Sequence, residues 1–80
     1  MRVWVLEYSH KHGVDLTAYA TPQAAEAGVA EIVREWWASE MRDVPGVPES
    51  PAELSDAAAV EMYFAHTSET HEIHDLLVYP

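Results

Sequence analysis

Two short segments that alternate between apolar and polar residues constrain this fold more than any other feature of the sequence. Residues 2–9 place Trp4 and Leu6 on one side of an extended chain, and residues 14–20 alternate in the same way. A period of two with β-branched and aromatic residues is typical of a strand. Gly13 lies between the segments and supplies the positive φ that a hairpin turn commonly needs. The sequence therefore predicts a β-hairpin at the start of the chain.

An amphipathic helix of about 20 residues is expected to follow the hairpin. Thr21 is a preferred N-cap residue, and Pro22 is favoured at the first helical position. Steps of three and four residues separate the side chains that we expect in the buried stripe of this helix: Ala25, Val29, Ile32 and Trp36. Because adjacent helical residues point about 100° apart, we expect Trp37 at the edge of the stripe. Gly28, inside the helix, indicates a close packing contact.

A proline-rich loop and a second helix are expected in the middle of the chain. Residues 43–51 contain three of the five prolines, which predicts a loop. Ser50 and Glu53 have the spacing of a capping box, and this pattern predicts the start of a second helix. The alanine-rich run that follows favours a helix as far as Phe64, although residues 60–64 also alternate as a strand would.

Residues 70–79 predict a closing strand, because Ile73 and Leu77 fall on one side of it. A chain of 80 residues is expected to form one domain, 1–80, with no part large enough to fold alone. We therefore expect an α+β fold in which two helices cover one face of a small antiparallel three-stranded sheet. The predicted order is ββααβ, with ββαββ as the alternative if a second hairpin forms near residues 67–69.

The composition excludes several classes of protein. The chain has no cysteine, which excludes disulfides, thiolate zinc sites and thiol catalysis. No apolar stretch is long enough to span a bilayer, and the first ten residues resemble a strand more than a leader peptide, so we expect a cytoplasmic protein. Fourteen acidic residues against four basic ones give a net charge of −10. Such a balance argues against nucleic acid or an anionic membrane as a direct partner.

The excess negative charge lies in the part of the chain that comes after the predicted hairpin. Residues 26–61 hold nine carboxylates against two arginines, whereas residues 1–25 are neutral. Rows of exposed carboxylates imitate phosphates and are attracted to basic grooves. We therefore predict a small acidic, non-enzymatic interaction protein, an inhibitor that occupies the basic, nucleic-acid-binding surface of a host protein complex. The predicted partner-binding residues are Glu31, Glu35, Glu49, Glu53, Asp56 and Glu61, with Trp37 as an apolar anchor.

Five histidines raise the alternative of a metal-binding domain or a small metal-dependent enzyme. His10 and His12 lie in the predicted hairpin, and His71 and His74 form an H-x-x-H pattern. We expect the two pairs at opposite ends of the domain, so neither a metal nor another cofactor is predicted. The chain lacks phosphate-binding and nucleophile-elbow motifs, and no catalytic residue is predicted. A third interpretation is a self-associating accessory domain, a homodimer in which the charge serves only solubility.

Residues 10–15, His-Lys-His-Gly-Val-Asp, resemble the hairpin of short uncharacterised bacterial and phage proteins. This resemblance implies a fold of the same outline and no particular function. In size, charge and lack of cysteine, the chain is also similar to phage-encoded inhibitors such as anti-CRISPR proteins. That second similarity implies a nucleic-acid mimic directed against a host complex.

Overall fold

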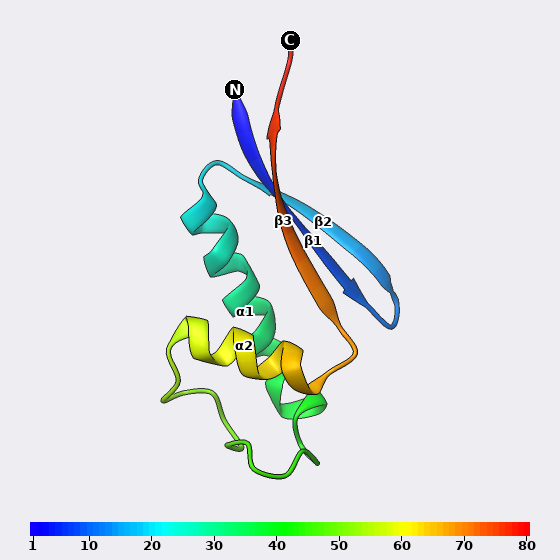
Figure 1. Ribbon diagram of the computed structural model, residues 1–80, viewed down its shortest axis with the longest axis vertical. Helices are drawn as coiled ribbons and strands as arrows, with labels where there is room; N and C mark the ends of the chain where they lie inside the picture. Colours follow the sequence, from blue (N-terminus) through cyan, green and yellow to red (C-terminus); the bar gives the residue numbers. More distant parts are fainter.

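The computed structural model describes residues 1–80 as three strands and two helices (Figure 1). In chain order the elements are β1 (Arg2–His10), β2 (Gly13–Tyr19), α1 (Pro22–Glu40), α2 (Asp56–His66) and β3 (Thr70–Leu77). β1 is the central strand and pairs antiparallel with both neighbours, which gives the sheet order β2-β1-β3. The predicted α+β fold and the order ββααβ are confirmed, because the segment that also alternates like a strand is helical.

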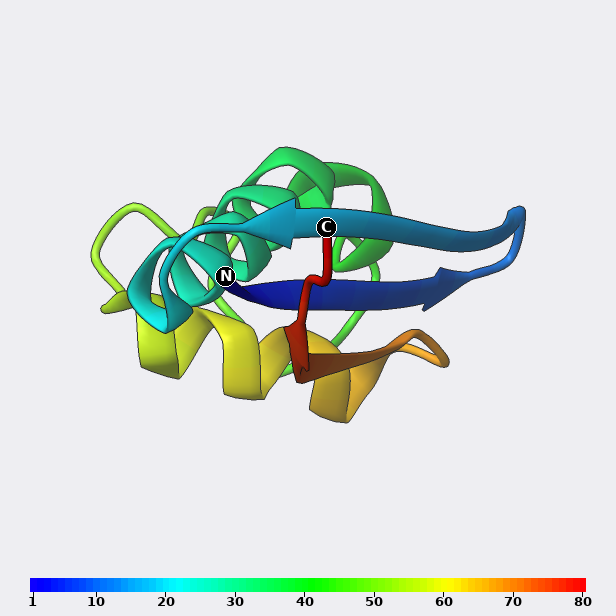
Figure 2. The same cartoon turned by 90° about the horizontal axis from the view of Figure 1, so that it is seen from above.

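The helices cover one face of the sheet and leave the other uncovered. Seen from above, α1 lies level with β2 and β1, and α2 lies level with β3 (Figure 2). Leu6 and Tyr8 of β1 are buried beneath the helices, on the side of the strand that its alternation predicts. On the uncovered face, Val14, Leu16 and Leu76 are each at least 50 % exposed. This uncovered face therefore carries exposed apolar side chains beside polar ones such as Glu7, Glu72 and His74.

α1 begins where the sequence predicts. Thr21 is its N-cap, and the Thr21 side chain accepts a hydrogen bond from the backbone amide of Ala24. Gly28 faces the end of β2, where an added Cβ would overlap the hydroxyl oxygen of Tyr19. The predicted close contact is confirmed, and it brings α1 against the sheet.

The assignment of the two tryptophans is wrong. Trp37 is only 1 % exposed, whereas Trp36 is 46 % exposed. The buried cluster between the helices comprises Val33, Trp37, Met41, Ala59 and Tyr63. Because α2 covers the second half of α1, the buried stripe turns toward α2 and takes Trp37 with it. Trp37 also donates a hydrogen bond from its indole nitrogen to the carbonyl of Pro48 (3.0 Å), so it is a core residue and no accessible anchor.

The second helix begins later than predicted. Ser50 accepts a hydrogen bond from the amide of Ala52, within a turn that precedes the helix. Ser55 is the N-cap of α2, and its side chain accepts from the amide of Ala58. The helix then continues to His66, just beyond its predicted end.

Arg34 of α1 contacts the turn that precedes this helix. Its guanidinium donates to the carbonyls of Pro51 (2.8 Å) and Leu54 (2.9 Å), which a helix starting at Pro51 would use for its own hydrogen bonds. The same group pairs with the carboxylate of Asp56 at 2.8 Å. These contacts hold the loop against α1.

The direction of β3 corrects the expected placement of the histidines. Ser9 pairs with Thr70, so β3 starts at the hairpin end of the sheet. α2 lies across α1 rather than running back along it, and the chain therefore never returns to the far end before β3 (Figure 1). His10 and His71 accordingly lie at the same end of the sheet. His71 and His74 point to opposite faces, because they are three residues apart in a strand.

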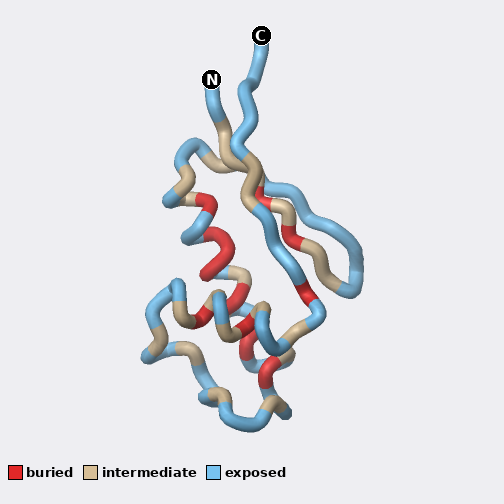
Figure 3. Tube along the Cα trace, in the orientation of Figure 1, coloured by how far each residue is buried: buried red, intermediate tan, exposed pale blue.

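The molecule is elongated. Its principal extents are 49 × 26 × 16 Å, and its radius of gyration is 13.7 Å. A compact domain of this length has a radius of gyration of about 12 Å. Both chain ends project at one end of the long axis, and the buried segments lie away from them (Figure 3).

Neither helix is long and apolar enough to cross a membrane.

The burial of Trp37 leads to a test of the core. Replacing Trp37 with alanine is expected to cost about 3–5 kcal/mol of unfolding free energy, because it leaves a cavity between the helices. Trp36→Ala is expected to cost clearly less, because nearly half of the surface of Trp36 is already exposed to solvent. Urea unfolding followed by circular dichroism measures both values. Equal losses in the two variants would contradict this description of the core.

Candidate functional site

The six carboxylates predicted to bind a partner are all exposed. They lie on three segments, with Glu31 and Glu35 on α1, Glu49 and Glu53 in the loop, and Asp56 and Glu61 on α2. Glu31 and Glu35 share one face of α1, a single turn apart. Asp56 alone among the six forms a salt bridge, with Arg34. The structure therefore brings Glu31 and Glu35 together and distributes the other four over the loop and α2.

The few basic residues leave most of the acidic ones without a partner. Three cations form salt bridges, in the pairs Arg2–Asp75, Lys11–Glu40 and Arg34–Asp56. The exposed carboxylates that pair with no basic residue or histidine are Glu26, Glu31, Glu35, Asp43, Glu49, Glu53 and Glu61. All of them lie between residues 26 and 61, so the uncompensated charge belongs to the helices and the loop between them.

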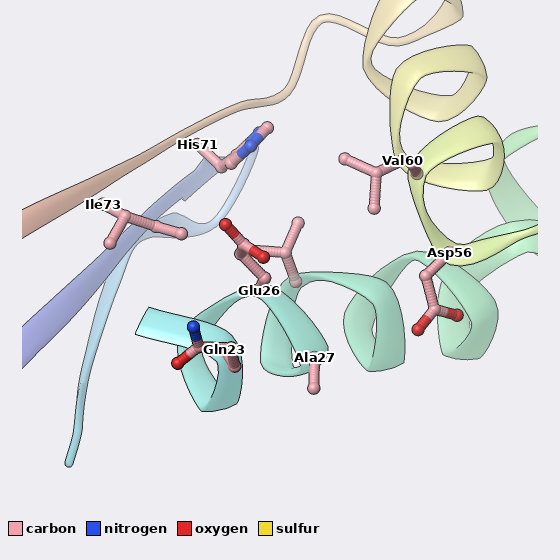
Figure 4. A pocket seen from close by; sticks show the side chains of 9 residues that line it. Gln23, Glu26, Ala27, Asp56, Val60, His71 and Ile73 are labelled. Atoms are coloured by element: carbon pink, nitrogen blue, oxygen red, sulfur yellow. The ribbon is translucent and has the colours of Figure 1, made fainter. Parts of the chain in front are cut away.

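An open groove of about 470 Å³ lies between α1, α2 and β3. Its apolar lining includes Val60 and Ile73, and Figure 4 shows Glu26 turned from α1 into the groove. His71 lies at one side of the groove, with its ring 4.3 Å from that of Phe64. Partial burial lowers the pKa of His71 below its usual value. The groove thus offers a partly apolar surface lined by two carboxylates, those of Glu26 and Asp56.

A second pocket, which we call the hairpin pocket, lies between the hairpin end of the sheet and the last turns of α1. Its volume is about 260 Å³. The residues that line it are Tyr8, His10, Lys11, His12, Asp15, Trp36, Ser39 and Glu69. The pocket exists because β3 starts at the hairpin end, which brings Glu69 next to the hairpin.

Glu69 is a buried acidic residue, 8 % exposed, immediately before β3. Its Oε1 accepts hydrogen bonds from the hydroxyls of Tyr8 (2.5 Å) and Tyr63 (2.7 Å). Burial, together with the hydrogen bond to Glu69, raises the pKa of both tyrosines well above the usual value. The two hydroxyls therefore remain donors at any physiological pH. The second carboxylate oxygen, Oε2, accepts no hydrogen bond from the protein.

The ring of His10 is held in one orientation. Its Nδ1 accepts from the backbone amide of His12 (3.2 Å), so the proton of the neutral ring lies on Nε2 and is donated to Oδ2 of Asp15 (2.9 Å). The ring centroid of His10 is 4.9 Å from that of Tyr8 and 6.1 Å from that of His12. Three rings thus form a continuous wall of the hairpin pocket.

Three metal-ligating side chains meet on the uncovered face of the sheet. Glu7 and Glu72 are direct cross-strand partners. Nε2 of His74 lies 2.9 Å from Oε1 of Glu7 and 3.6 Å from Oε2 of Glu72, and the three ligand atoms lie within 4.8 Å of one another. Of the four histidines considered as metal ligands, His74 alone belongs to such a group.

Sequence reasoning missed Glu7, and it considered Glu69 only as a possible metal ligand beside the histidines. The sequence places Glu69 next to the predicted last strand. Its position beside the hairpin depends on the direction of that strand, which the sequence does not specify. Glu7 reaches His74 through the pairing of strands that are far apart in the sequence. Neither side chain stands in a recognisable motif.

No protein-family model, curated protein or solved structure matches this chain. The similarity to phage-encoded inhibitors therefore stays a prediction from the sequence.

The buried tyrosine pair gives a prediction on stability. Tyr63→Phe is expected to cost about 1–3 kcal/mol, because buried Glu69 loses a donor. Unfolded tyrosines ionise near pH 10 while the folded pair stays protonated, so this stabilisation is complete below about pH 10 and declines above it. The decline should be shallower in Tyr63→Phe than in the unaltered protein or in Tyr79→Phe, which changes an exposed ring. Urea unfolding at a series of alkaline pH values measures this, and identical slopes would refute it.

Proposed function

We propose that this chain is a small acidic interaction protein that binds a basic surface of a partner protein and thereby keeps nucleic acid from that surface. The segregation of unpaired carboxylates to residues 26–61 is the observation that carries the proposal. Like charges at this density cost stability, and a basic partner would offset that cost. Complementary charge would also speed the encounter between the two proteins.

The acidic residues are held in place before any partner arrives. Glu31 and Glu35 project from a regular helix on the face away from the core, so little order has to be gained on binding. The loop that carries Glu49 and Glu53 is fixed to α1 by the hydrogen bonds of Arg34. A preorganised row of carboxylates suits a basic groove better than a disordered acidic tail would.

Charge removal on α1 tests this function. In Glu31→Gln/Glu35→Gln, binding to a nucleic-acid-binding protein captured from the source cells is expected to weaken several-fold. The control Glu72→Gln/Asp75→Asn removes the same net charge from β3 and is expected to bind nearly as the unaltered chain does. Captured proteins are identified by mass spectrometry, and their affinity is measured over a range of salt concentrations with and without duplex DNA.

Support requires that binding falls with added salt, as screening demands, and that DNA competes for it. Equal weakening by the two double variants would assign the effect to net charge alone. Full binding by Glu31→Gln/Glu35→Gln would remove α1 from the interface and contradict the proposal.

A second candidate function, binding of a divalent cation, is favoured by the convergence of Glu7, Glu72 and His74. One imidazole and two carboxylates are ligands that suit Zn²⁺, and three protein ligands leave a position for water. Saturating Zn²⁺ is therefore expected to raise the melting temperature of the unaltered protein by several degrees. His74→Asn should abolish the shift, whereas His66→Asn, on α2, should retain it. The same shift in both variants would contradict this second function.

A further inference from the structure

We infer that the hairpin pocket binds one lysine or arginine side chain and is the anchor point for a basic partner. That the side chain comes from a basic partner protein rests on the proposed function. The ability of the pocket to bind a cation depends only on the residues that line it. The pocket combines a buried carboxylate, aromatic walls and an acidic rim, which together recognise an organic cation.

Glu69 supplies the negative charge inside the pocket. The residue is more than nine-tenths buried, and the two tyrosine hydroxyls donate only to Oε1. Oε2 has no donor within the protein, and Glu69 forms no salt bridge. Oγ1 of Thr67 is the one fully buried polar side-chain atom without a hydrogen-bond partner, so Oε2 of Glu69 is open to the pocket, where a donor or a cation can reach it. An ammonium or guanidinium group entering the pocket would provide both.

Aromatic rings supply the walls. The rings of Tyr8, His10 and His12 follow one another along the hairpin side. Trp36 lines the pocket from α1, and its 46 % exposure leaves the indole available to a ligand. Aromatic faces attract cations, tryptophan most strongly. The aliphatic part of a lysine or arginine would lie against these rings while its charged head points to Glu69.

The charged groups around the pocket favour a cation over an anion. Asp15, Glu40 and Glu69 oppose a single basic residue, Lys11. The ammonium of Lys11 lies 3.7 Å from Oε1 of Glu40, so its charge is already directed to the rim. Asp15 is hydrogen-bonded to His10 and remains exposed. A second cation is therefore attracted to the interior of the pocket, where the carboxylate of Glu69 has no cationic partner.

The size of the pocket limits the ligand to one side chain. A volume of about 260 Å³ accommodates a single long side chain and no folded segment. The two adjacent tryptophans have different roles at such a site. Trp37 completes the core, and Trp36 is free to face the ligand.

Two matched probes test the site. Nα-acetyl-lysine methylamide is expected to shift the NMR signals of the Trp36 indole and of residues 10–13 in a saturable way. Nα-acetyl-norleucine methylamide keeps the four-carbon chain of lysine without the ammonium group, and it should not. Trp36→Leu and Glu69→Gln should each weaken the lysine probe about ten-fold, the size expected for a desolvated cation–aromatic or charge contact. Glu69→Gln keeps a side-chain oxygen that can accept hydrogen bonds from both tyrosines, so this variant is expected to remain folded.

Other outcomes overturn the inference. Equal shifts with the norleucine probe would reduce the site to an apolar pocket, and shifts located elsewhere would remove it. Unaltered affinity in Trp36→Leu, which changes an exposed side chain and so remains folded, would refute the site whatever the behaviour of Glu69→Gln. Glu31→Gln/Glu35→Gln serves as the control, because these residues lie outside the pocket and should leave probe affinity unchanged.

The failure of this site and the failure of the proposed function give different results. If only the site fails, Glu31→Gln/Glu35→Gln weakens partner capture and Trp36→Leu does not. If only the proposed function fails, no salt-sensitive partner is captured, yet the lysine probe still binds. If both hold, each variant weakens capture independently.

Discussion

A single carboxylate oxygen, Oε1 of Glu69, connects three elements of this small fold. The hydroxyl of Tyr8 reaches it from β1 and that of Tyr63 from α2, while Glu69 itself directly precedes β3. α2 otherwise packs mainly on α1. The shared acceptor therefore ties the position of α2 to the sheet at the point where β3 begins. The hairpin pocket follows from this arrangement, because the carboxylate that joins the three elements is also its inner wall.

The elements could be predicted because their signals are local. Alternation defines the hairpin, and Thr21 with the following proline defines the start of α1. The errors arose where a contact from another element decided between two equal local choices. Trp37 rather than Trp36 is buried because α2 packs on that side of α1. Ser55 rather than Ser50 caps α2, and Arg34 holds the preceding turn through the carbonyls of Pro51 and Leu54.

The candidate sites were harder to predict than the fold. Local spacing places Glu31 and Glu35 on one helix face, and the structure leaves them exposed there. The groupings around Glu69 and Glu7 depend instead on β3 lying antiparallel to β1. That direction follows from the way α2 crosses α1, which no residue pattern in the chain specifies. In a sequence with few motifs, exposed charges can therefore be predicted from the residues alone, whereas pockets cannot.

The long outline of the molecule affects how it moves in solution. With extents of 49 Å and 16 Å along its longest and shortest axes, it experiences more friction than a sphere of the same 9.0 kDa. A monomer will therefore elute early from a gel-filtration column and will tumble at different rates about its different axes. Early elution by itself is thus no sign of a second copy. Sedimentation or light scattering, which separate mass from shape, will distinguish a lone chain from two chains joined through the uncovered face of the sheet.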